Sequence, residues 1–128
     1  MAEITADVNW LAVIVGAVVA FIVGWLWYSP ALFGKQWAAG NNVELGSASK
    51  MPVAAMVLQA IGLFLVAWFV GVTAVGSMLA TFILAVIAFG VLNASGALFV
   101  KKPNNVVLID FAYLIVVAAV MFIAQAVL

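Results

Sequence analysis

Residues 51–100, with the sequence MPVAAMVLQAIGLFLVAWFVGVTAVGSMLATFILAVIAFGVLNASGALFV, form a stretch of 50 residues without a charged side chain. A helix rises about 1.5 Å per residue, so about 20 apolar residues cross the hydrocarbon core of a bilayer. The stretch is too long for one such helix and has the length of two. Thr73, Gly76 and Ser77 interrupt the apolar sequence and predict the connection between these two helices.

Two further apolar stretches lie on either side of this segment. Residues 8–28 separate Asp7 from Lys35 without a charge, and residues 106–128 contain a single charge, Asp110. The sequence therefore predicts an all-α fold, an integral membrane bundle of four transmembrane helices that forms one domain over residues 1–128. The predicted helices span about 8–29, 52–73, 77–97 and 105–127, and the predicted cytoplasmic loops span 30–51 and 98–104.

The composition supports a membrane protein and excludes several classes of function. Of the 128 residues, 70% are hydrophobic and 6% are charged, whereas a soluble domain has about half apolar and a quarter charged residues. The chain has no Cys, His or Arg, so it lacks thiol nucleophiles, histidine bases and the usual zinc ligands. We therefore expect no enzyme, no cofactor and no metal site. The net charge of zero also argues against nucleic-acid binding.

The lysines predict how the chain is oriented. Lys35 and Lys50 fall in the first long connection, and Lys101 and Lys102 fall in the last one. With four spans, both connections lie on the same side of the membrane, and the positive-inside rule places that side in the cytoplasm. We expect a multi-pass protein of the inner (cytoplasmic) membrane with both termini outside.

The first span is not expected to be a cleaved signal peptide. A signal peptide begins with a basic region, but Glu3 and Asp7 precede this span. The apolar run that follows is also longer than the 7 to 15 residues typical of such a peptide.

An aromatic motif marks the end of the first predicted helix. Trp and Tyr favour the membrane–water interface, and Pro30 disfavours a helical conformation at the preceding residue. The sequence therefore predicts that the helix ends near Ser29 and that a short segment then lies in the interface. The residues of this motif are Trp27, Tyr28, Ser29, Pro30, Phe33, Lys35 and Trp37.

An internal match at an offset of 66 residues relates the ends of the first and third helices. Residues 24–35 share seven identities in twelve positions with residues 90–101, including a serine and a lysine. This match favours two tandem hairpin repeats in the same orientation. A chance match in an apolar chain is the alternative, because the second and fourth helices show no comparable likeness.

The same residues carry a resemblance to a known family. The chain resembles the membrane family called domain of unknown function 1761, over about the first 37 residues and over residues 90–115. Members of this family are small bacterial proteins with four helices, so the resemblance implies the same topology and supplies no substrate. The motifs that carry it are Trp27-Tyr28-Ser29-Pro30, Leu32-Phe33-Gly34-Lys35, Trp37, Leu98-Phe99, Lys102-Pro103, Leu108-Ile109-Asp110 and Tyr113.

Four polar residues within the spans are candidates for a binding site in the cytoplasmic third of the membrane: Asp110, Tyr113, Asn93 and Gln59. Asp110 either titrates or binds a cation, or it is an anchor paired with the helix amino terminus and Lys101 or Lys102. We expect Gln59 to hydrogen-bond between helices, while Asn93 fits either a site or a helix contact.

Small residues recur at every fourth position of the first helix, at Ala12, Gly16, Ala20 and Gly24. Such a groove lets a second helix pack closely. The second helix belongs either to the same bundle or to another copy of the chain, and the sequence does not distinguish the two.

The leading hypothesis is an oligomeric transporter or permeation unit for a small solute or proton. The alternative is an accessory or scaffolding subunit of a membrane complex without a solute path. The expected partners are the lipid bilayer, further copies of the chain in a homo-oligomer and, for the alternative, a larger membrane complex.

Overall fold

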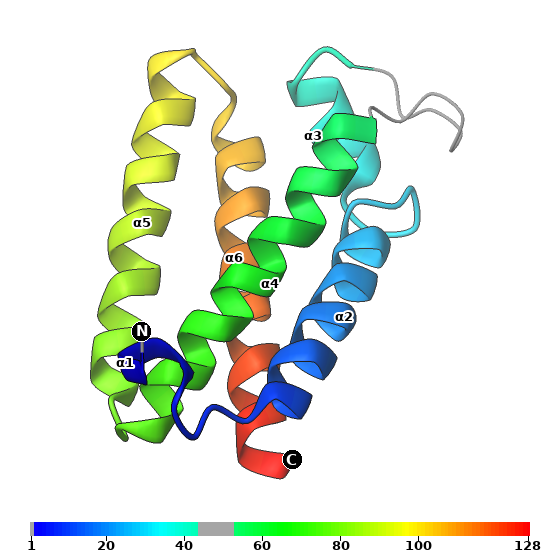
Figure 1. The fold of residues 1–128 in the computed structure, drawn as a ribbon. Helices are drawn as coiled ribbons and strands as arrows, with labels where there is room; N and C mark the ends of the chain where they lie inside the picture. Colours follow the sequence, from blue (N-terminus) through cyan, green and yellow to red (C-terminus); the bar gives the residue numbers. More distant parts are fainter. Residues whose placement is uncertain (1, 44–52) are drawn as a thin grey trace.

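A computed structural model describes residues 2–43 and 53–128 and shows a helical bundle (Figure 1). Four helices are long and apolar enough to cross a membrane, and the described residues contain no strand. These helices are α2 (Trp10–Trp27), α4 (Val53–Val75), α5 (Leu79–Phe99) and α6 (Asn104–Val127). The prediction of an all-α bundle with four spans is confirmed.

Two short helices accompany the four long ones. Helix α1 (Ala2–Thr5) precedes the first span, and α3 (Gly34–Gly40) follows its aromatic end. The predicted start of the second span at residue 52, and the charged residues Glu44 and Lys50, lie outside the described residues.

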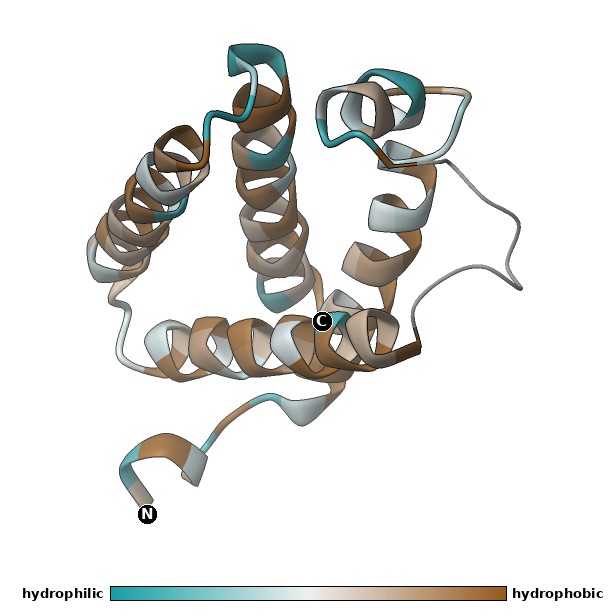
Figure 2. Ribbon diagram, turned by 90° about the horizontal axis from the view of Figure 1, so that it is seen from above, coloured by the Kyte–Doolittle hydropathy of each residue, from teal (hydrophilic) through white to brown (hydrophobic). Residues whose placement is uncertain are grey.

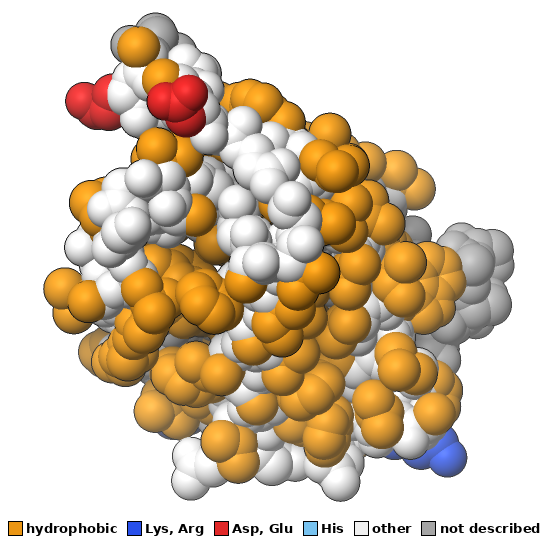
Figure 3. Space-filling view, turned by 90° about the horizontal axis from the view of Figure 1, so that it is seen from below, with side chains coloured by type: hydrophobic (Ala, Val, Ile, Leu, Met, Phe, Trp, Pro, Cys, Tyr) orange, Lys and Arg blue, Asp and Glu red, His pale blue; other side chains and the backbone are white. Residues whose placement is uncertain are grey.

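The two ends of the bundle differ in charge. Lys35 in α3 and Lys101 and Lys102 after α5 lie at one end, which we call the lysine end. Both chain termini lie at the opposite end, which we call the terminal end (Figure 1). Acidic side chains lie on the N-terminal segment there, and hydrophobic side chains cover much of the face that Figure 3 shows. Helices α2 and α5 run in one direction and α4 and α6 return, so the chain forms two hairpins of the same orientation.

Local residue choices define where the first span begins and ends. The side chain of Asn9 accepts a hydrogen bond of 3.1 Å from the backbone N–H of Ala12 and so caps the start of α2. The helix ends at Trp27, and the turn that contains Pro30 leads directly into α3. The backbone N–H of Phe33 donates to the carbonyl of Trp27 at 3.0 Å, which closes this turn.

A tight turn joins α4 to α5 at the terminal end. The backbone N–H of Met78 donates to the carbonyl of Thr73 at 2.8 Å. Ser77 adopts a left-handed conformation with φ 55°, a conformation that a non-glycine residue adopts at some cost in energy. The connection therefore follows Val75, so the helix includes Thr73, which the sequence suggested as part of the turn.

The small residues of α2 pack against α6 inside the bundle. Ala12, Gly16 and Ala20 are buried. A Cβ atom added to Gly16 would lie 3.5 Å from both Met121 and Ala124 of α6, which is ordinary van der Waals contact. These contacts show that the small residues of α2 pack against α6 within the bundle, which is one of the two interpretations of the groove.

Helices α4 and α5 meet at the terminal end and separate towards the lysine end (Figures 1 and 2). At the terminal end, the rings of Phe69 and Phe82 lie 6.5 Å apart between centroids. Only 11% of the apolar window of α5 is buried, against 28% for α2 and for α6. One side of α5 is therefore left without a helical neighbour in the single chain.

The N-terminal segment is fixed to α4. The indole N–H of Trp68 donates to the carbonyl of Ile4 at 2.7 Å, and the rings of Trp10 and Trp68 lie 5.4 Å apart. The polar atom of an indole in the middle of a span is thereby satisfied, as membrane-embedded polar groups require.

Candidate functional site

Asp110 of α6 is held by two neutral hydrogen-bond donors at the lysine end. The hydroxyl of Tyr28 donates to its Oδ1 atom at 2.6 Å, and the indole N–H of Trp37 donates to the same atom at 3.0 Å. The sequence suggested Lys101 or Lys102 as partners, but neither lysine bonds this carboxylate among the described residues. The anchoring interpretation of Asp110 is thus favoured, with aromatic donors in place of lysines.

The donors come from the motif at the end of the first span. Tyr28 follows α2 directly, and Trp37 lies in α3, so the Pro30 turn brings both side chains towards α6. Trp27 adds a third bond, from its indole N–H to the carbonyl of Ile109 at 3.2 Å. We use the term aspartate–aromatic cluster for Trp27, Tyr28, Trp37, Asp110 and Tyr113.

Ring contacts tie this cluster together. The ring of Tyr28 lies edge-on to Trp37, with 5.5 Å between centroids, and edge-on to Tyr113 at 5.4 Å. Edge-to-face geometry suits the quadrupoles of aromatic rings. The rings pack on one another, which makes the cluster a structural joint between α2, α3 and α6.

The electrostatics of the cluster favour a protonated Tyr28. Burial raises the pKa of Tyr28 above its ordinary value of 10.0, and the hydrogen bond to Asp110 and the charge of that carboxylate raise the pKa further. The hydroxyl therefore remains a hydrogen-bond donor to Asp110 at physiological pH.

Tyr113 occupies the space left by a glycine. Its hydroxyl donates to the carbonyl of Ala20 at 2.9 Å, and a Cβ atom added to Gly24 would overlap that hydroxyl. The side chain of Gln59 on α4 lies beside the same hydroxyl. Tyr113 thus connects α2, α4 and α6, and Gln59 contacts a second helix as the sequence suggested.

Asn93 does not join the other three polar candidates. Its side chain is exposed, and it has no hydrogen-bond partner among the described residues. Asp110 and Tyr113 are linked through the ring of Tyr28, and Gln59 reaches Tyr113, so the structure connects three of the four predicted residues.

We use the term lysine-end opening for the surface of α4 and α5 at the lysine end, where the two helices separate, that carries Gln59, Gly62, Asn93 and Gly96. No atom lies within 4 Å of a Cβ atom added to Gly62 or Gly96. Gly62 lies two turns from Phe69 and so shares its face of α4. Asn93 lies eleven residues from Phe82 and so shares its face of α5. These residues therefore continue the Phe69 face of α4 and the Phe82 face of α5 towards the lysine end.

A second recess lies at the terminal end of the same three helices. This terminal-end pocket has a volume of about 260 Å³ and is bounded by residues of α4, α5, α6 and the α4–α5 turn. Three of its lining residues are polar: Thr73, Ser77 and Gln125. Gln125 could not be identified from the sequence, because its position beside the turn depends on how α6 packs.

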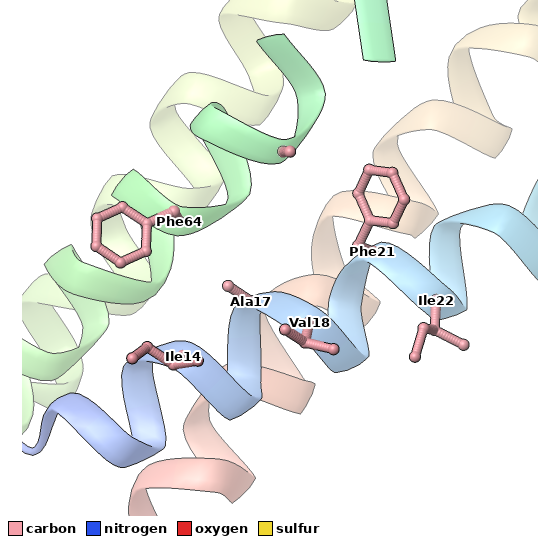
Figure 4. A pocket seen from close by; sticks show the side chains of 7 residues that line it. Ile14, Ala17, Val18, Phe21, Ile22 and Phe64 are labelled. Atoms are coloured by element: carbon pink, nitrogen blue, oxygen red, sulfur yellow. The ribbon is translucent and has the colours of Figure 1, made fainter. Parts of the chain in front are cut away.

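An apolar groove lies between α2 and α4 (Figure 4). It has a volume of about 320 Å³, and its lining residues are all apolar. They are Ile14, Ala17, Val18, Phe21, Ile22, Ala60 and Phe64. The groove offers no side-chain hydrogen bond and is compatible with the hydrocarbon that surrounds a membrane protein.

A comparison with models of known families finds one that matches residues 11–125, described as "Protein of unknown function (DUF1761)". The chain belongs to the DUF1761 family. A comparison with curated proteins and with solved structures finds no match.

In this DUF1761 protein, the two stretches that carry the resemblance meet in space. Tyr28 and Trp37 from the first stretch both bond Asp110 from the second, across 82 and 73 residues of sequence. Motif positions from both stretches thus meet in the aspartate–aromatic cluster at the lysine end, which joins the first hairpin to the last helix.

Proposed function

We propose that this DUF1761 protein is an oligomeric permeation unit for small, uncharged polar solutes, with its path along the face shared by α4, α5 and α6. The observation that carries the proposal is that polar side chains occur at both ends of this one face. Gln59 and Asn93 border the lysine-end opening, and Thr73, Ser77 and Gln125 line the terminal-end pocket.

The chemistry of these side chains favours neutral solutes. Amides and hydroxyls both donate and accept hydrogen bonds, so they can replace the water around a small polar molecule. None of the residues that define the opening or line the pocket is charged. An ion would lose its hydration without a compensating charge, whereas a neutral solute loses much less. Asp110 is engaged by Tyr28 and Trp37 and is therefore not assigned to the path.

The part of the face between the two polar regions is apolar, and we assign the role of a gate to it. It begins at Phe69 and Phe82, where Phe82 also lines the terminal-end pocket, and Val117 of α6 belongs to the same buried core as Phe82. A hydrophobic constriction of this kind can stop water and solutes by dewetting.

The proposed orientation follows the lysines. Lys35, Lys101 and Lys102 lie together at the lysine end, so that end faces the cytoplasm under the positive-inside rule. The lysine-end opening then faces inwards, the terminal-end pocket faces outwards, and the protein is placed in the inner membrane.

The proposal is tested by the permeability of vesicles that contain the purified protein. After an osmotic step with glycerol or urea, they should reswell faster than empty vesicles. Gln125→Leu should slow the reswelling, because it removes an amide from the terminal-end pocket. Val91→Leu is the matched control, since residue 91 lies outside both polar regions on α5. The proposal would be overturned if vesicles that contain the wild-type protein were no more permeable to glycerol or urea than empty vesicles.

A second function, an accessory or scaffolding subunit without a solute path and without enzymatic activity, is favoured by the aspartate–aromatic cluster. The sole charge within the spans is engaged in joining α3 to α6, which is a structural task. Under this alternative, vesicles show no solute permeability, and Asp110→Leu weakens the retention of a partner protein during purification from native membranes.

A further inference from the structure

We infer that α5 of a second copy of this chain packs against the Asn93 side of α5 and closes the lysine-end opening towards the lipid without filling it, with Asn93 at the centre of the contact. This inference rests in part on the proposed function, because a path bounded by α4, α5 and α6 alone lacks a fourth wall. The contact depends on the amide of Asn93, whose hydrogen-bonding groups a lipid chain does not satisfy.

The environment of Asn93 favours a polar partner. The residue lies six positions before the end of α5, or about 9 Å from the lysine end along the helix axis. Its amide is exposed and has no hydrogen-bond partner among the described residues. An acyl chain would leave the amide unsatisfied at this depth, and such a group in hydrocarbon is costly. The exposed amide therefore requires water or a polar partner.

The amide of Asn93 can bond to the amide of a second Asn93. Asparagine carries both a donor and an acceptor, so two copies of Asn93 related by a two-fold axis can bond to each other. Contacts of this isologous kind, in which the same patch serves both partners, are the commonest among homo-oligomers. A second copy of the chain is thus a sufficient partner, and no other protein is needed.

The surface beside Asn93 has room for a second helix. Gly96 lies one turn after Asn93 on the same face, and nothing lies within 4 Å of a Cβ atom added there. A neighbouring helix backbone can approach a glycine closely enough for short side chains to bond across the interface. By contrast, the space beside Gly90 on the same helix is occupied, since an added Cβ atom would overlap Phe111 of α6.

Cysteine cross-linking tests the contact directly, because the chain has no native cysteine. Asn93→Cys and Gly96→Cys should each form a disulfide-linked dimer under mild oxidation in vesicles. Val91→Cys is the matched control, because its side chain is 55% exposed and residue 91 lies on the opposite side of α5 from Asn93. Equal cross-linking at all three positions, or preferential cross-linking at Val91→Cys, would overturn the inference.

Self-association measured by energy transfer between labelled chains gives a second, independent result. Asn93→Leu should weaken association by about 3- to 30-fold, the range expected for one interhelical amide bond. Asn93→Gln keeps the amide and should retain much of the association. A wild-type chain that is monomeric in lipid, or an Asn93→Leu variant that associates as well as the wild type, would refute the inference.

The two proposals fail in different ways. If Asn93→Cys forms disulfide-linked dimers but the vesicles show no solute permeability, the permeation function is refuted and the contact is kept. If the vesicles are permeable but Asn93→Cys forms no more disulfide-linked dimer than Val91→Cys, the contact is refuted and the permeation function is kept.

Discussion

The seam between α2 and α6 and the face between α4 and α5 both contain glycines, but their surroundings are opposite. In the seam, a Cβ atom on Gly24 would overlap the Tyr113 hydroxyl. A side chain of α6 therefore occupies the space that a side chain at residue 24 would take. On the open face, an added Cβ atom at Gly62 or Gly96 would meet nothing within 4 Å. Glycine therefore lies in a close-packed helix contact in the seam, whereas on the open face it has no neighbouring helix within contact distance.

Small residues in a membrane helix therefore do not by themselves identify an oligomer interface. In the seam, the recurring small residues of α2 allow α6 to approach and Tyr113 to bond the Ala20 carbonyl. On the open face, the polar amide of Asn93 distinguishes the surface from one that faces only lipid.

The largest effect is expected at Gly24. Gly24→Leu places a side chain where the Tyr113 hydroxyl lies, and it breaks the 2.9 Å bond from that hydroxyl to Ala20. We expect a loss of about 3 kcal/mol in the free energy of unfolding, the upper part of the usual range for overpacking. Unfolding in mixed micelles of a mild detergent and sodium dodecyl sulfate, followed by circular dichroism, measures it. A variant as stable as the wild type would show that the seam is not packed as described.

Loss of the acceptor in the aspartate–aromatic cluster should have the next largest effect. Asp110→Leu removes the acceptor for Tyr28 and Trp37, and hydrogen bonds to a charged group contribute about 1.5–3 kcal/mol each when buried. Because the cluster is only partly buried, we expect a loss of about 2 kcal/mol in total.

Asp110→Asn is the matched control, since it keeps an oxygen acceptor and should lose about half as much. The fluorescence of Trp37 should also change in Asp110→Leu, most simply measured in a variant that keeps Trp37 as its only tryptophan. Equal stability of the Leu and Asn variants would argue against the two hydrogen bonds.

The cluster also predicts a pH dependence. The pKa of Tyr28 is raised in the folded protein, while in the unfolded chain the pKa returns to its ordinary value of 10.0. Above pH 10 the unfolded state therefore ionises first, and the free energy of unfolding should decrease as the pH rises. Below that value the contribution of this tyrosine should be fully present.

Comparison of wild type and Tyr28→Phe isolates this effect from the titration of lysines and Tyr113. The variant should lose less stability between pH 9 and pH 11, a window of about one unit on each side of the ordinary tyrosine pKa. Identical pH profiles for the two proteins would show that Tyr28 is not held protonated by its surroundings.

The smallest effects are expected on the open face. Gly62→Ala and Gly96→Ala add a methyl group into open space and remove a residue of low helix propensity. We expect no loss of stability and a gain of up to about 1 kcal/mol in the isolated chain. Comparison with Gly24→Ala, which should be destabilised, makes the contrast between the regions quantitative. A clear loss at Gly62→Ala would place a neighbour where the structure has none.

The spans could be predicted from the sequence because four charge-free or nearly charge-free stretches have the length of a bilayer. The partners of Asp110 could not be predicted, since Trp37 and Tyr28 lie 73 and 82 residues away and a polar residue in a span gives no sign of its neighbour. The separation of α4 from α5 depends on how Phe69 meets Phe82 and how α4 is tilted. A periodic apolar pattern does not encode that tilt.

The accessibility of one cysteine on each face, measured in vesicles, tests the contrast most directly. Gly62→Cys lies on the open face and Ala20→Cys in the filled seam, each roughly 10–14 Å from the lysine end along its helix. A water-soluble, membrane-impermeant maleimide reacts only where water reaches the thiolate. We predict rapid labelling of Gly62→Cys from the lysine side and almost none of Ala20→Cys. Equal labelling at both positions, or labelling of Ala20→Cys alone, would contradict the account.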